Sequence, residues 1–353
     1  MLLSSRLKAI ALQVLIALIL LNLSAVGAAE IYRWVDENGK VHFSDQKPLN
    51  TTKSSELSSI ELGLSESARF EALQGEVGRI VLKQVAHGQY QQYIPKEGLI
   101  LKTLKIVVVN HGMFGKSENE LISAKNTLDD WIPFSEKHQA IIVAPAYDNA
   151  NYAVTERGDG KGGYRGLFGR KVGADEFLHE IILEYQRAKT TYDGRFYLSG
   201  HSAGAQFANR YLVRHPERVI AAAFSAPAWY AQPTESFKWP YGMGRRQFNS
   251  RWPGENISRK IDIQPNKSDW LAAAQKPVAV VVGELDLDKL RYVEGIGGDT
   301  HVGRAKHWVN AMNQYAQRFG KQGRVELKLI PAVGHNYGKL ARQCQKFLEQ
   351  YMQ

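Results

Sequence analysis

The sequence contains a single cysteine, Cys344, among its 353 residues. One cysteine excludes an intrachain disulfide and every zinc site built on several cysteines. The chain also lacks an H-E-x-x-H motif, internal repeats and low-complexity tracts, and its glycine-rich segment 158–173 lacks the Gly-Lys-Ser/Thr of a phosphate-binding loop. We therefore expect no metal and no cofactor. The composition, 44% hydrophobic and 23% charged, excludes wholesale disorder.

Long apolar runs are also scarce, because only residues 10–21 form one, and that run is shorter than the roughly 20 residues that span a bilayer. Arg6 and Lys8 precede the run and small residues follow it, which is the layout of a secretory signal. We predict that residues 1–29 are a signal peptide and that the mature chain is periplasmic or secreted, with a retained anchor as the alternative. The net charge of +10 suits contact with an anionic cell envelope or serves solubility. Export argues against a nucleic acid partner.

Two short runs of alternating apolar and polar residues flank Asn38-Gly39, and this pattern predicts a β-hairpin over residues 30–48. The stretch resembles a short domain of unknown function that follows the signal peptide in many exported Gram-negative bacterial proteins. The resemblance rests on the pattern Tyr32-x-Trp34-Val35-Asp36-x-x-Gly39-x-Val41-x-Phe43-Ser44-Asp45. Residues 49–77 are rich in Ser, Thr, Lys and Glu, and we expect a linker there that could end in a short helix.

The remaining residues, 78–353, alternate short apolar runs with amphipathic stretches. Several runs are almost continuous Val, Ile and Ala, as in strands buried on both faces of a parallel sheet. We predict strands at residues 79–85, 106–110, 140–145, 195–199, 219–225, 278–283 and 325–330. Helical periodicity marks residues 175–190, 304–319 and the C-terminus, where Cys344 lies on the apolar stripe as an expected buried, inert thiol. The alternation predicts an α/β fold with a doubly wound, mostly parallel sheet.

A G-x-S-x-G motif, Gly200-His201-Ser202-Ala203-Gly204, lies between a predicted strand and a predicted helix. A serine at such a sharp turn needs small neighbours, because the strained backbone passes close to the next strand. The turn exposes the hydroxyl group and places a helix N-terminus beneath it, where a developing negative charge is stabilised. We predict that Ser202 is a nucleophile; a serine in an ordinary surface loop is the alternative.

A serine nucleophile needs a base, and the base needs a carboxylate that orients it. His335 follows the last predicted strand by a few residues, and we predict that it is the base. Active sites of α/β proteins form at the carboxyl ends of parallel strands. We therefore choose Asp286, just past residues 278–283, as the acid, and keep Asp288, Asp299 and Glu284 as alternatives.

Two further groups of residues complete the predicted site. The backbone N–H groups of Met113, in the loop after residues 106–110, and of Ala203 are candidate donors to a tetrahedral oxyanion. Residues 231–270 form a long excursion that could cover the serine as a cap. Its Trp239 and Trp252 are candidate substrate contacts, and a self-packed surface loop is the alternative.

The order of His111-Gly112, residues 200–204, Asp286 and Gly334-His335 resembles the α/β-hydrolase superfamily over residues 111–335. Within it the chain is similar to secreted esterases related to polyhydroxyalkanoate depolymerases and feruloyl esterases. The resemblance implies an exported serine hydrolase that cleaves small-molecule or polymeric carboxylic esters through an acyl-enzyme intermediate. A serine peptidase with the same three residues is one alternative. A non-catalytic envelope-binding protein on a hydrolase scaffold is the other.

Overall fold

The computed structural model describes residues 65–98, 104–113, 118–152, 163–251 and 258–352, together with the backbone of residues 32–35, 41–44 and 54–56. The predicted signal peptide at residues 1–29 and the side chain of Trp252 lie outside the described residues. Among the helices that are described, none has both the length and the apolar character needed to cross a bilayer.

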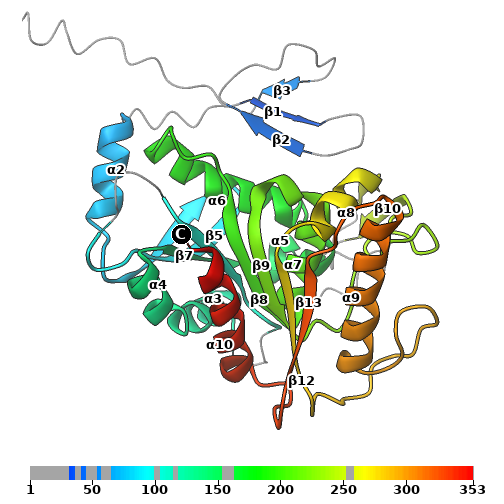
Figure 1. Cartoon of the computed structure of the whole chain (residues 1–353). Coiled ribbons are helices and arrows are strands. Elements are labelled where there is room, and N and C mark those ends of the chain that lie inside the picture. The colour runs from blue at the N-terminus through cyan, green and yellow to red at the C-terminus, as the bar shows by residue number, and fades with distance from the viewer. Residues whose placement is uncertain are drawn as a thin grey trace, which may run out of the picture.

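The N-terminal strands form a small antiparallel sheet of their own. Strands β1 (Tyr32–Val35) and β2 (Val41–Ser44) pair as the predicted hairpin. Strand β3 (Ser54–Glu56), which lies in the predicted linker, pairs with the other edge of β1, so the sheet order is β2-β1-β3 (Figure 1). A lone hairpin is marginally stable in water, and the third strand adds backbone pairing that the hairpin lacks.

The body is built on an eight-stranded sheet with the order β13-β12-β9-β8-β6-β7-β5-β4. The six strands from β13 to β7 are all parallel to their neighbours in this order. Strand β5 runs in the opposite direction and is antiparallel to both β7 and β4. The strands are β4 (Ile80–Val85), β5 (Gly88–Tyr93), β6 (Ile106–Asn110), β7 (Ile141–Ala146), β8 (Phe196–His201), β9 (Val219–Ser225), β12 (Val278–Gly283) and β13 (Val325–Ile330). The mostly parallel, doubly wound sheet confirms the predicted fold class.

The central strands are apolar on both faces because helices cover both faces (Figure 1). In β12, Val278, Val280 and Val282 pack into one core cluster, whereas Ala279 and Val281 pack into the other. This alternation follows from the two-residue repeat of a strand. The covering helices are α6 (Ala174–Ala188), α7 (Ala203–Arg214), α8 (Lys267–Ala274) and α9 (His301–Arg318) on one face, and α3 (Glu120–Asp129), α4 (Ile132–His138) and α10 (Tyr337–Leu348) on the other.

Shorter elements join these layers. They are α2 (Glu66–Gln74), α5 (Asn149–Tyr152) and the 3-10 turns η1 (Gly163–Gly166), η2 (Pro216–Arg218) and η3 (Glu349–Tyr351). Helix α2 forms at the end of the predicted linker, starts at the N-cap Ser65 and packs against α6. Cys344 is buried on α10, as predicted, and burial raises the pKa of its thiol to about 12.

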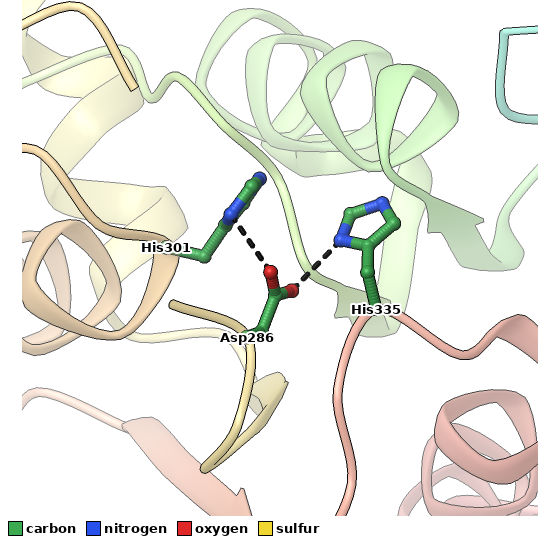
Figure 2. A group of neighbouring side chains, drawn as sticks. All are labelled: Asp286, His301 and His335. Carbon is green, nitrogen blue, oxygen red and sulfur yellow. Dashed lines mark hydrogen bonds and ion pairs between the residues drawn. The ribbon is translucent and has the colours of Figure 1, made fainter. Parts of the chain in front are cut away.

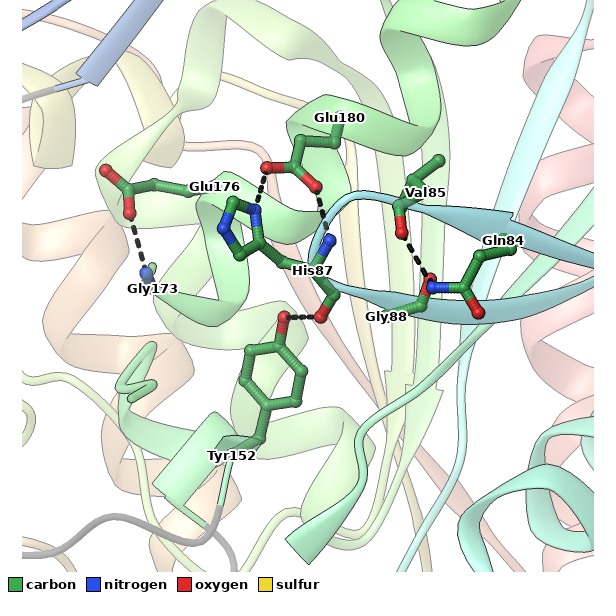
Figure 3. Close-up of polar contacts among 8 residues, drawn as sticks. All are labelled: Gln84, Val85, His87, Gly88, Tyr152, Gly173, Glu176 and Glu180. Carbon is green, nitrogen blue, oxygen red and sulfur yellow. Dashed lines mark hydrogen bonds and ion pairs between the residues drawn. The ribbon is translucent and has the colours of Figure 1, made fainter. Parts of the chain in front are cut away.

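Polar contacts hold the turn between β4 and β5 against α6 (Figure 3). Glu180 accepts a hydrogen bond from the backbone N–H of His87 and contacts the imidazole of the same residue. From the other side, Tyr152 donates its hydroxyl hydrogen to the His87 carbonyl at 2.7 Å. The contacts from Glu180 and Tyr152 therefore fix the position of the β4–β5 hairpin at the edge of the sheet.

The predicted insertion, residues 231–270, contains a hairpin of β10 (Arg246–Arg251) and β11 (Ser258–Ile263) and continues into α8. Just past β11, the Gln264 carbonyl accepts a hydrogen bond from Arg214, the last residue of α7. Helix α7 has 12 residues and is therefore about 18 Å long. The base of this hairpin thus lies at the end of α7 away from Ser202.

Candidate active site

Ser202 lies at the turn between β8 and α7 in a strained backbone conformation. Its φ of 52° and ψ of −110° fall in a region that a residue with a side chain rarely adopts. The turn is anchored to the next strand, because the Ser202 backbone N–H donates to the Ser225 carbonyl at 2.9 Å. The side chain remains partly exposed at the carboxyl edge of the sheet.

The two glycines of the motif are required because the backbone passes too close to leave room for a side chain. A Cβ on Gly200 would lie 2.4 Å from the Gly204 carbonyl oxygen. A Cβ on Gly204 would lie 2.1 Å from the carbonyl oxygen of Asn110 and 2.5 Å from that of His111. These are main-chain atoms, which cannot move aside cheaply. The spacing of the motif is therefore explained by helix α7 crossing β6 at close range.

Asp286 and His335 are brought together at the same edge of the sheet (Figure 2). His335 Nδ1 donates to Asp286 Oδ2 at 2.8 Å, because a carboxylate can only accept. Glu284 and Asp288, the alternatives in the same loop, are exposed, whereas the Asp286 side chain is fully buried. Burial disfavours the charged carboxylate, but the contacts with His301 and His335 outweigh it and hold the pKa of Asp286 well below its usual range.

His335 is placed next to the residue that precedes the serine. Its ring centroid lies 4.8 Å from that of His201, and its side chain is 31% exposed. Burial, followed by the charge of His335, lowers the pKa of His201 to about 3, so His201 is neutral at physiological pH. Within the described residues, Ser202 Oγ makes no hydrogen bond with His335. In a ligand-free site such a bond is commonly long and shortens when substrate binds.

The loop after β6 is fixed by the side chain of His111, a role that the sequence does not indicate. His111 Nδ1 donates to the Gly112 carbonyl at 2.7 Å, and Nε2 accepts from the Tyr147 backbone N–H at 3.2 Å. Tyr164 also donates to the Gly112 carbonyl, at 3.3 Å. Burial lowers the pKa of His111 to about 4, and the ring is therefore neutral. With the Gly112 carbonyl held on this side, the Met113 N–H of the same trans peptide points the opposite way.

Gly112 also brings this loop beside the serine. A Cβ on Gly112 would lie 3.7 Å from Ser202 Cβ. Met113, the next residue, is half exposed at this edge. The predicted oxyanion donors, Met113 and Ala203, are therefore on the two segments that flank Ser202.

Trp239 and Trp252 do not join this group in the described structure. Trp239 has no exposed surface, and its indole N–H donates to the Gly166 carbonyl at 2.9 Å. This placement is contrary to its predicted contact with substrate, because the ring packs edge-on against Trp270 inside the core. Trp252 lies outside the described residues.

A cavity of about 200 Å³ lies at the start of the predicted insertion instead. Its walls include Trp229, Tyr230 and Tyr241 from the segment after β9, and Arg291 and Arg304 from the region after β12. Arg304 is stacked over the Trp229 ring, 4.0 Å from its centroid. The negative charge of Asp286 is felt at Tyr230 and raises the pKa of that phenol together with burial, which dominates. Arg304 lies on the first turn of α9, and this helix begins at His301, which contacts Asp286.

Asp286, His301 and His335 also place their possible metal-ligating atoms within 4.8 Å of one another. Both imidazoles face the carboxylate with Nδ1. A nitrogen that donates a hydrogen to a carboxylate has no lone pair left for a metal ion. His335 Nδ1 makes such a hydrogen bond with Asp286 and is therefore not free to hold a metal ion in this arrangement.

Two family models match the sequence. A domain of unknown function (DUF4124) matches residues 18–61, and a family described as serine aminopeptidase, S33 (Hydrolase_4), matches residues 146–321. No curated protein matches the sequence.

Solved structures share the fold of the body. Poly(aspartic acid) hydrolase-1 from Sphingomonas sp. KT-1 is 21% identical, with a TM-score of 0.57 over 76% of this chain and 97% of that chain. LpqC, the poly(3-hydroxybutyrate) depolymerase from Bordetella parapertussis, is 21% identical, with a TM-score of 0.58 over 82% of this chain and 94% of that chain. At this identity the likeness extends to the fold and not to the activity.

Proposed function

We propose that this chain, whose body has the α/β-hydrolase fold, is an exported serine hydrolase that cleaves carboxylic esters through an acyl-enzyme intermediate. The observation that carries the proposal is the strained Ser202 turn at the same sheet edge as the hydrogen-bonded pair of His335 and Asp286. This is the set of groups that nucleophilic acyl transfer needs: a nucleophile, a base and a carboxylate that orients the base.

The reaction begins when His335 Nε2 takes the proton of Ser202 Oγ as the oxygen attacks the acyl carbon. Asp286 holds Nδ1 of His335, which fixes the tautomer and stabilises the imidazolium cation that forms. The C–O bond to the alcohol then breaks, and the alcohol takes the proton from His335. Water repeats the sequence on the acyl-enzyme and releases the acid together with free Ser202.

The tetrahedral oxyanion is stabilised by two backbone N–H groups. Ala203 is the first residue of α7, so its N–H has no partner within the helix and carries the positive end of the helix dipole. Met113 presents its N–H away from His111, which holds the preceding carbonyl on the other side. Donors fixed before the reaction cost no reorganisation during it, which is the source of their catalytic effect.

The cavity bordered by Trp229, Tyr230 and Tyr241 receives one substituent of the ester. Its walls combine aromatic rings with the guanidinium groups of Arg291 and Arg304, so it suits an aromatic or polar substituent better than a cation. Small esters and the ends of polymeric esters both satisfy this requirement. LpqC is described as acting on a polyester, which agrees with the proposed substrate class.

A serine peptidase is the second candidate, because specific observations favour it. The matched family is described as a serine aminopeptidase, and one of the structural neighbours is a hydrolase of poly(aspartic acid). The same three residues serve either chemistry.

The test compares turnover of matched ester and amide substrates that share one acyl group. We expect ester turnover by the purified protein, its loss in Ser202→Ala and its retention in Ser236→Ala, which removes an exposed serine distant in sequence. A preference for the amide would establish the peptidase instead. Equal turnover by wild type and Ser202→Ala would refute both candidates, and no turnover of either substrate by the wild type would leave the envelope-binding alternative.

Export is supported by the predicted signal at residues 1–29 and by the match of residues 18–61 to DUF4124. Expression of the full chain in a Gram-negative host should yield a periplasmic or secreted product whose N-terminus lies near Glu30. A full-length product in the cytoplasmic fraction would contradict export without affecting the proposed chemistry.

A further inference from the structure

Asp286 is contacted by a second histidine that the proposed reaction does not use. His301 Nδ1 lies 3.0 Å from Asp286 Oδ1, and His335 Nδ1 lies 2.8 Å from Oδ2. Figure 2 shows one imidazole directed at each oxygen of the carboxylate, and the two ring centroids lie 5.0 Å apart. The two histidines come from different elements, because His301 is the first residue of α9 and His335 lies in the loop after β13.

The contact with His301 is isolated from other polar groups. The side chains of Asp286 and His301 are 0% and 6% exposed. The contact lacks the geometry of a hydrogen bond, and neither Oδ1 nor His301 Nδ1 has a hydrogen-bond partner among the described residues. A buried carboxylate oxygen without a donor is costly, so each of these two atoms depends on the other.

We propose that His301 is a positioning residue that holds Asp286 through Oδ1, so that Oδ2 stays aligned with Nδ1 of the base His335. The χ2 torsion of an aspartate has a broad energy minimum, so a single hydrogen bond does not fix the plane of the carboxylate. The hydrogen bond from His335 to Oδ2 and the close contact of His301 with Oδ1, which come from two separate elements, together define that plane. The inference rests on the proposed function for its catalytic consequence, but the alignment itself is a property of the fold.

The roles of the two histidines differ because their surroundings differ. His335 is 31% exposed and borders His201, the neighbour of Ser202. His301 lies beside the His335 ring but is only 6% exposed. The other titratable groups near Asp286 are His201 and Tyr230. Only His335 is therefore placed to exchange protons with a substrate at Ser202.

The test replaces His301 by leucine, which has no donor, and by asparagine, whose amide N–H can reach a similar position. We expect His301→Leu to lower kcat about 10-fold or more with KM changed less than about twofold, and His301→Asn to recover most of kcat. The acid limb of the kcat/KM profile should move to higher pH in His301→Leu, because an unshared carboxylate holds the proton on His335 more tightly. His307→Leu, on the same helix, is the matched control and should change none of these.

A second readout does not depend on ester turnover. The Nδ1 proton that His335 shares with Asp286 should give a strongly deshielded proton NMR resonance in the wild-type protein. We expect this resonance to broaden or move upfield in His301→Leu and to remain in His301→Asn. An unchanged resonance with unchanged kcat in His301→Leu would overturn the inference, as would equal losses in both variants. Absence of ester turnover in the wild type would refute the proposed function, and the resonance would still decide the role of His301.

Discussion

Replacing His111 by glutamine should remove part of the acid sensitivity of folding. His111 has no exposed surface, and burial lowers its pKa from the ordinary 6.5 to about 4. Between these values the unfolded chain binds a proton that the folded chain does not, so stability rises with pH in this window and is lost as pH falls. A difference of roughly 2.5 pH units, at about 1.36 kcal/mol per unit, amounts to about 3 kcal/mol.

The assay is urea unfolding followed by tryptophan fluorescence at about pH 7.5 and about pH 4. The loss of unfolding free energy caused by His111→Gln should be about 3 kcal/mol larger at the higher pH. Only the wild type is destabilised in acid by the burial of a neutral His111 that is protonated in the unfolded chain. Tyr164→Phe is the matched control, since it removes the other donor to the Gly112 carbonyl without a group that titrates in this range. Parallel profiles for wild type and His111→Gln would refute the reasoning.

Further predictions concern packing. Gly204→Ala should cost about 3 kcal/mol of unfolding free energy, because its Cβ would lie 2.1 Å from a main-chain oxygen. Gly112→Ala, whose Cβ contacts lie at 3.6 and 3.7 Å, should cost less than about 1 kcal/mol. Equal losses of unfolding free energy in urea would contradict this expectation. The Cys344 thiol, 1% exposed, should resist alkylation in the native protein and react fully after denaturation, and native labelling at the denatured rate would show that it is not buried. Trp239→Phe should cost about 1–3 kcal/mol by leaving the Gly166 carbonyl without its donor, with little change in KM for esters. A large change in KM would restore the predicted contact of Trp239 with substrate.

The sequence indicates the parallel core well, because strands such as β12 are buried on both faces and consist of valine, alanine and glycine. It does not indicate β5, whose sequence is Gly-Gln-Tyr-Gln-Gln-Tyr. The buried Gln92 of this strand bonds Tyr185 and Glu76, which lie on other elements. A sequence pattern predicts that such a polar residue is exposed, because its hydrogen-bond partners come close only when the chain folds.

The same distinction applies to the site. Ser202, Asp286 and His335 follow predicted strands, and a parallel sheet brings the ends of its strands to one edge. The contact of His301 with Asp286 depends instead on how the first turn of α9 lies against the loop after β12, and no local pattern encodes that arrangement. The role of His111 is hidden for a related reason, since its partners, Tyr147 and Gly112, are defined by the path of two loops.

The central claim is that Ser202 is an activated nucleophile. The most direct measurement is treatment of the native protein with a fluorophosphonate probe, followed by mass spectrometry of the intact chain and of its peptides. The account predicts a single adduct per chain, located on Ser202, formed slowly or not at all in His335→Ala. No adduct on the native protein, or an adduct on another residue with Ser202 unmodified, would contradict it.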